Sequence, residues 1–224
     1  MIKEWTEDIE ALAKIAEYDH QLVYSAYVFG TSRRWQYVCR TTPKISVLKK
    51  LEEVIKSKLI PKIIGKEFSS DKMRAIMKLP ARLGGFGFQI PAEEAQFENE
   101  NSQIATKQLT EAITLQQATL SINATLEEAV MKLVSKRNAE RQEQMQLALK
   151  QTLSERQNKL LLLSSEKGVS IWLTTIPLKG HGFCLNKQQF IDVIAMRCDL
   201  RLKDVPEVLC MWKRLQHKPL SVMQ

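Results

Sequence analysis

The residue types that could carry chemistry in this sequence are lysine and arginine, because they are concentrated in one stretch. Residues 32–82 contain fourteen Lys or Arg and four acids, a net charge of +10, whereas residues 1–31 carry −4 and residues 83–224 carry +2. A basic block of this density attracts polyanions, and each contact to a phosphate releases counterions. The sequence therefore predicts sequence-independent binding of RNA, DNA or both. The candidate phosphate contacts are Arg33, Arg34, Arg40, Lys49, Lys56, Lys62, Lys78 and Arg82.

A second interpretation treats the basic block as a solvated helix surface. Glu52 and Lys56 stand four residues apart in the order that stabilises a helix, so part of the charge is neutralised within the block. The chain would then be a non-catalytic helical scaffold whose partner is another protein. Clustering of the eight candidate cations on one face would favour nucleic acid over this alternative.

No pattern of residues as clear as the basic block indicates catalysis or metal binding. His181 lies between two glycines, but no Ser, Cys or paired carboxylate stands near it in sequence, so a turn histidine is favoured. A zinc site is disfavoured by the irregular spacing of its potential ligands, and reduced, mostly buried thiols are expected. These potential ligands are Cys184, Cys198, Cys210 and His217. The sequence predicts a protein that is not an enzyme and holds neither metal nor cofactor.

The basic block lies just before a glycine-rich loop that is expected to hold the geometry of the block. Residues 79–88 read Leu-Pro-Ala-Arg-Leu-Gly-Gly-Phe-Gly-Phe and hold three of the eight glycines, Gly84, Gly85 and Gly87. Glycine permits positive φ and the close approach of another backbone. No Gly-Lys-Ser/Thr follows, and the spacing is not G-x-G-x-x-G, so a phosphate-binding loop is disfavoured. The loop is expected to fix the packing of the helices on either side.

Helical periodicity dominates the remaining sequence and predicts a mostly α fold. Amphipathic helices are expected over residues 4–17, 20–29 and 47–59, with Trp35 in the core, and a short helix capped at 69–71 runs to Lys78. Residues 92–167 lack glycine and proline and should be helical, with breaks near 99–102 and 121–123. Within this span residues 135–144 are almost wholly polar, which predicts a solvated strut or mobile linker.

The expected organisation is a basic helical domain over residues 1–120, a helical linker over 121–165 and a small α(+β) module over 166–208. In that module Trp172 and Phe183 should bury against a helix over 188–196. No run of about 18 apolar residues exists, and the N-terminus is acidic where a signal peptide would be basic. A cytoplasmic or nuclear protein without a membrane partner is therefore expected.

Three stretches match known motifs in a fixed order. Residues 79–88 resemble the pattern Leu-Pro-x-Arg-Leu-Gly-Gly-Leu-Gly-Ile, with Phe86 and Phe88 in place of Leu and Ile, and residues 26–41 contain Ala-x-x-x-Gly, Trp-x-Tyr and Arg-Thr elements. Residues 165–197 contain Trp172-Leu173, His181-Gly-Phe183 and Arg197 in the order of a Trp-Leu, His-Gly-Phe and Leu-Arg module. Together these stretches resemble the region that follows the catalytic core in reverse transcriptases of non-long-terminal-repeat retrotransposons.

The resemblance implies a thumb-like domain over residues 1–120 and a connector, the parts that grip template and primer after the palm has ended. Polymerase chemistry needs carboxylates that hold two metal ions, and the six aspartates here include no Asp-Asp pair. Met1 falls inside what is continuous protein in that family. We therefore expect a fragment of an RNA-directed DNA polymerase that lacks the catalytic palm and retains template-primer binding.

The last residues, 209–224, are expected to be a disordered, out-of-frame tail. In the resembling family the module is followed by a Cys-x-Cys-Gly, His and Cys motif, which is missing here. Met211-Trp212 can be encoded only by ATG-TGG and Met223-Gln224 must contain TGC, so a shifted reading frame gives two cysteines at the family's spacing. The translated tail should bind no zinc tightly.

Overall fold

The computed structural model describes residues 2–42, 45–67, 70–116 and 124–200 of the 224-residue chain. Every regular element within these ranges is helical, which confirms the mostly α fold. No strand occurs in the described residues of the C-terminal module, 166–200, so the β contribution expected there is not found in that part. The expected out-of-frame tail, 209–224, lies outside the described residues.

Two long helical rods form the centre of the fold, and each contains one π-helical turn. The first rod comprises α2 (His20–Ser25), η1 (Ala26–Thr31) and α3 (Ser32–Thr41); the second comprises α4 (Ile45–Val54), η2 (Ile55–Leu59) and α5 (Ile60–Ile64). The π turn of the second rod directly precedes Pro61, whose missing N–H and ring would disturb a regular α-helix there. Gly65, at φ 68°, ends that rod as a left-handed cap.

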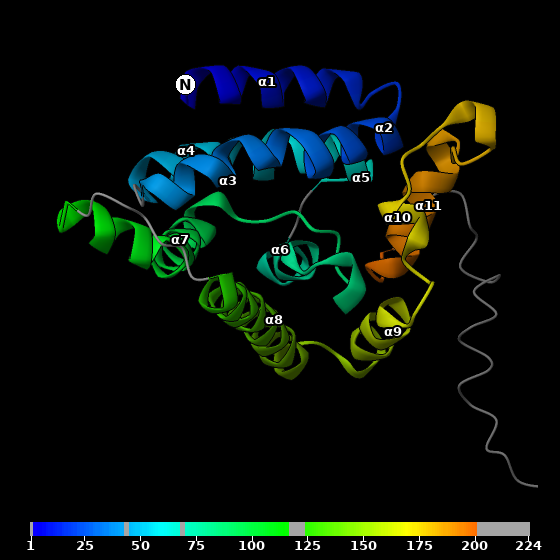
Figure 1. Ribbon diagram of the computed structural model, residues 1–224. Coiled ribbons are helices and arrows are strands. Elements are labelled where there is room, and N and C mark those ends of the chain that lie inside the picture. The colour runs from blue at the N-terminus through cyan, green and yellow to red at the C-terminus, as the bar shows by residue number, and fades with distance from the viewer. Residues whose placement is uncertain (1, 43–44, 68–69, 117–123, 201–224) are drawn as a thin grey trace, which may run out of the picture.

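The helix α1 (Ile2–Ile15) lies across both rods (Figure 1). Its buried side chains, Trp5, Ile9 and Ala13, follow the helical spacing that the sequence predicts. The rings of Trp5 and Trp35 are 6.1 Å apart, and Trp35 is only 2 % exposed, which confirms its place in the core. α1 is thus anchored by an apolar stripe that leaves its acidic side chains at the surface.

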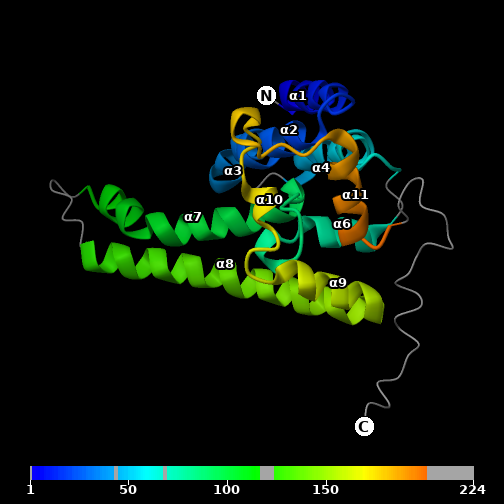
Figure 2. The same cartoon turned by 90° about the vertical axis from the view of Figure 1, so that its right-hand side faces the viewer.

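A long hairpin of two helices packs beneath the rods. The helices that follow the rods are α6 (Asp71–Lys78), η3 (Ala81–Leu83), α7 (Pro91–Thr114), α8 (Ala124–Thr152) and α9 (Glu155–Ser165). Ser70 caps α6 by accepting a hydrogen bond from the amide of Met73. Figure 2 shows α7 and α8 running side by side in opposite directions. This arrangement places the long polar helix against the body of the protein.

The expected break at residues 99–102 is wrong, because α7 continues through them. Their amide side chains find partners beside the helix instead of interrupting it. Asn99 donates to the Arg40 carbonyl at 2.9 Å, and Asn101 donates to the Asn138 side chain at 3.2 Å. Residues that would favour a turn in isolation are thereby accommodated within a continuous helix.

The polar stretch 135–144 lies against α7 rather than standing free in solvent. Arg141 forms an ion pair with Glu94 at 2.7 Å, and its guanidinium lies 4.2 Å from the centroid of the Phe97 ring. Arg137 approaches the same ring at 5.7 Å and pairs with Glu100 at 3.2 Å. Cation–π contacts of this kind attach a helical stretch that has no apolar face.

The C-terminal part consists of α10 (Ile171–Thr174), η4 (Lys179–His181) and α11 (Lys187–Arg197). Trp172 packs edge-on against Phe190 of α11, with 5.7 Å between the ring centroids. Phe183 was expected to bury against the same helix, but it is 52 % exposed and stacks on His181. That expectation is wrong, because the Phe183 ring is paired with the histidine of the turn at residues 179–182 and remains half exposed.

Candidate nucleic-acid interface and the glycine loop

Two of the three loop glycines occupy positions that exclude any side chain. A Cβ atom at Gly85 would stand 2.1 Å from the carbonyl oxygen of Leu79, and one at Gly84 would stand 2.6 Å from that of Leu161. Gly84 also has a φ of 89°. Gly87 has a φ of 74° but more space around it. Glycine is therefore required at positions 84 and 85 because another backbone approaches closely, and it is favoured at position 87 because of the backbone conformation.

The amide groups of the loop are already occupied within the chain. Gly84 donates to the Ala81 carbonyl, Gly85 to that of Pro80 and Gly87 to that of Leu79, at 2.8–3.1 Å. An anion-binding loop needs amides that point at a ligand. The glycine loop therefore acts as a packed structural element and offers no cradle for a phosphate.

Two buried arginines hold the loop from opposite ends. Arg74 of α6 donates to the carbonyls of Phe88 and Gln89 and forms an ion pair with Glu52. Arg197 of α11 donates to the carbonyls of Gly84 at 3.1 Å and Gly85 at 2.9 Å, and also to the Ala81 carbonyl and the Ser170 hydroxyl. Burial lowers the pKa of Arg197 to about 10, so it remains charged at neutral pH.

Neither of these roles is predicted from the sequence. Arg74 looked like one more cation of the basic block, although it stands three residues before Met77 on the buried side of α6. Its spacing within an apolar helix face was the available signal. Arg197 is 112 residues distant from Gly85, and no local pattern connects the two.

The eight candidate cations do not form one unpaired surface. Five of them make ion pairs, Arg33 and Arg82 donate to glutamine side chains, and Lys49 is exposed. The ion-paired cations and their acids are Arg34 with Glu4 and Asp8, Arg40 with Glu98, Lys56 with Asp71, Lys62 with Glu17 and Lys78 with Glu93. Some of these acids belong to α1 and others to α7, which pack on opposite sides of the rods (Figure 1). The candidates are therefore spread around the rods.

The acidic N-terminal segment meets the basic block in space. Glu4 and Asp8 lie against Arg34, and Glu10 lies against Lys58, a cation that the sequence analysis did not single out. The hydrogen bond from Lys58 is the main cause of the lowered pKa of Glu10, and that from Lys62 has the same effect on Glu17. The opposite charges of two neighbouring segments were the signal for this pairing.

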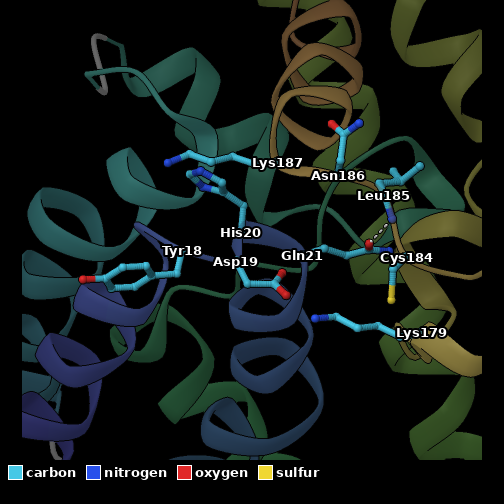
Figure 3. A pocket seen from close by; sticks show the side chains of 9 residues that line it. All are labelled: Tyr18, Asp19, His20, Gln21, Lys179, Cys184, Leu185, Asn186 and Lys187. Atoms are coloured by element: carbon cyan, nitrogen blue, oxygen red, sulfur yellow. Dashed lines mark hydrogen bonds between the residues drawn. The ribbon is translucent and has the colours of Figure 1, made fainter.

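A cavity of about 370 Å³ opens where α1 turns into α2 and faces the segment before α11. Figure 3 shows Lys187 beside His20 on one side of the cavity and Lys179 near Asp19 on the other. His20 is 4 % exposed, and burial, followed by the charge of Lys187, lowers its pKa. The cavity has charge of both signs, because the Asp19 carboxylate that caps α2 lies within its lining.

No arrangement of a nucleophile, a base and a metal site emerges from the residues that the structure describes. Burial raises the pKa of the Cys39 thiol to about 11 and that of Cys198 to about 12, which disfavours their thiolates. The described ranges contain no group of three or more His, Cys, Asp or Glu that could hold a metal ion.

Comparisons with family models, curated proteins and solved structures give no match. Among the described helices, none is long and apolar enough to span a bilayer.

Proposed function

We propose that this chain binds double-stranded RNA or DNA without sequence preference and performs no catalysis itself. The observation that carries the proposal is the excess of fourteen cations over four acids in residues 32–82. The motif resemblance supports a thumb and connector of a retrotransposon reverse transcriptase that has lost its palm. In that role the domain would hold a template-primer duplex by its phosphates.

Exposure of the paired cations supports this proposal. The side chains of Arg34, Lys58 and Lys62 are about half exposed, and Lys49 lies at the surface of α4. Exposed ion pairs contribute about 0–1 kcal/mol each. A duplex carries one phosphate charge per about 1.7 Å of its axis, so it can replace such carboxylate partners along a whole surface.

The salt dependence of duplex binding tests the proposal with the full chain. Fluorescence anisotropy should show similar affinity for duplexes of unrelated sequence and a steep loss with added salt. The slope to be measured is that of the logarithm of the binding constant against the logarithm of the salt concentration. The combined reversals Arg33→Glu, Arg34→Glu and Lys49→Glu should reduce the magnitude of this slope by about 2.7, since each lost phosphate contact removes about 0.9.

A matched control reverses three exposed lysines outside the block, Lys132→Glu, Lys136→Glu and Lys159→Glu, and changes net charge equally. The control should keep most of the wild-type slope. A slope that the block reversals leave unchanged would remove the proposed interface.

A helical scaffold for a protein partner is the second candidate. It is favoured by the ion pairs that occupy five of the eight candidate cations and by the spread of these cations around the rods instead of on one face. Absence of duplex binding even at low salt would select this alternative, because electrostatic contacts are strongest there.

A further inference from the structure

The acids of α1 lie on both sides of its buried stripe. In an ideal helix Glu4 and Asp8 fall on one side of the line through Trp5 and Ile9, and Glu10 falls on the other. The structure follows this pattern, since Glu4 and Asp8 pair with Arg34 of α3. On the opposite side Glu10 pairs with Lys58 of η2, and Glu17, in the turn after α1, pairs with Lys62 of α5.

These ion pairs differ from the pairs on the protein surface that form within a single helix. The pairs Lys132–Glu128, Lys136–Glu140 and Lys159–Glu155 join residues four apart within one helix. Those that Glu4, Asp8, Glu10 and Glu17 make with Arg34, Lys58 and Lys62 join residues that are 26 to 48 positions apart. The acids of α1 therefore neutralise cations of the basic block itself.

α1 cannot be removed from this position without opening the core. Trp5, Ile9, Ala13 and Ala16 are at most 7 % exposed, and Trp5 contacts Trp35 of α3. The acidic side chains themselves are 40–61 % exposed and can rotate in place. Any competition with a ligand must therefore occur between side chains while the helix stays docked.

We propose that α1 is a fixed acidic screen that competes with nucleic-acid phosphates for Arg34, Lys58 and Lys62. The inference rests on the proposed function and adds its regulation. A phosphate that approaches one of these cations must displace a carboxylate, and the displaced carboxylate remains nearby and repels it. At about 0.15 M salt the repulsion reaches about 8 Å, so it acts on phosphates that pass over α1.

Neutralising the four acids tests the screen. The variant carries Glu4→Gln, Asp8→Asn, Glu10→Gln and Glu17→Gln; the control carries Glu127→Gln, Glu128→Gln, Glu140→Gln and Glu143→Gln on α8. Both gain the same net charge. We expect the α1 variant to bind a duplex of about 20 base pairs about tenfold more tightly at about 0.15 M salt, with a slope steeper by up to about 2.7. The control should gain less than about twofold.

The outcomes separate the screen from the proposed function. Equal gains in the two variants would mean that only net charge matters, and wild-type affinity in the α1 variant would mean that its acids do not compete; either result overturns the screen while binding stands. If neither wild type nor variants bind a duplex at low salt, the proposed function fails, and the screen fails with it. The double variant Asp8→Asn and Glu10→Gln, with circular dichroism as a folding check, should show about half of the logarithmic gain.

Discussion

At the scale of single residues, Arg197 carries the attachment of α11 to the glycine loop. Arg197→Met keeps an apolar stem of similar length but leaves the carbonyls of Gly84 and Gly85 without their donor. Unsatisfied buried groups of this kind are costly, so we expect a loss of about 3–5 kcal/mol in the free energy of unfolding, measured with urea.

Two companion variants show whether the guanidinium geometry matters. Arg197→Lys should recover little of the lost stability, because one ammonium group cannot reach carbonyls that extend from Ala81 to Gly85. Arg82→Met removes an exposed arginine of the same loop and should change stability by no more than about 0.5 kcal/mol. A stable Arg197→Met protein would show that the loop does not depend on this residue.

The glycines provide a second test at this scale. Gly85→Ala places a methyl group against the backbone of Leu79, which cannot rotate away, so the free energy of unfolding should fall by about 3 kcal/mol. Gly30→Ala is the matched control, because nothing lies within 4 Å of its added Cβ and Gly30 is helical. It should stabilise by up to about 1 kcal/mol. Thermal and urea unfolding of the two proteins measure the contrast.

At the scale of elements, the sequence predicts the helices well and their polar contacts poorly. The apolar stripe of α1 and the core position of Trp35 both follow from spacing and residue type. The continuous α7 was missed because Asn99 is a helix breaker only when its amide finds a local backbone partner. The contacts of arginines with Phe97 were missed because hydrophobic periodicity does not predict the contact of a guanidinium with an aromatic ring.

The α7–α8 hairpin should unfold first at its tip, the end formed by the last turns of α7 and the first turns of α8. In α7 no described residue beyond Asn101 is buried, and in the described part of α8 none is buried before Leu149. Segments with few buried side chains open first. Limited trypsin digestion should therefore cut between residues 117 and 156 before any other region, with Lys132 and Lys136 cleaved ahead of Arg141.

Mass spectrometry over a short time course identifies the order of cuts in the hairpin. Glu94→Gln, which removes the carboxylate partner of Arg141, should make Arg141 susceptible sooner. Glu128→Gln is the control, since its ion pair lies near the tip and within one helix. Uniform resistance across the span would mean that the hairpin packs as firmly as the core.

At the scale of the whole molecule, side-chain contacts join the segments that the sequence divides into domains. The Gln21 side chain donates to the Phe183 carbonyl at 3.3 Å and accepts from the Leu185 amide at 2.7 Å. Lys187 donates to the Glu17 carbonyl, and Arg156 pairs with Asp199. Sequence reasoning could not find the contacts of Gln21 and Lys187 because polar groups more than 160 residues apart share no periodicity.

Three segments of the protein, distant in sequence, are expected to unfold cooperatively. Since Arg197 connects α11 to the glycine loop and Gln21 connects α2 to the segment just before α11, we expect residues 20–29, 79–88 and 187–197 to unfold in one transition. Hydrogen exchange measured against urea should give these three segments the same opening free energy, and the tip of the hairpin a lower one. The double variant Gln21→Ala and Arg197→Met should lower the opening free energy of residues 187–197 more than that of the other two segments. The control Lys159→Gln should change the opening free energy of none of the three segments. If residues 187–197 of the wild-type protein open at lower urea than the glycine loop, the C-terminal module is an independent unit, as the sequence alone suggests.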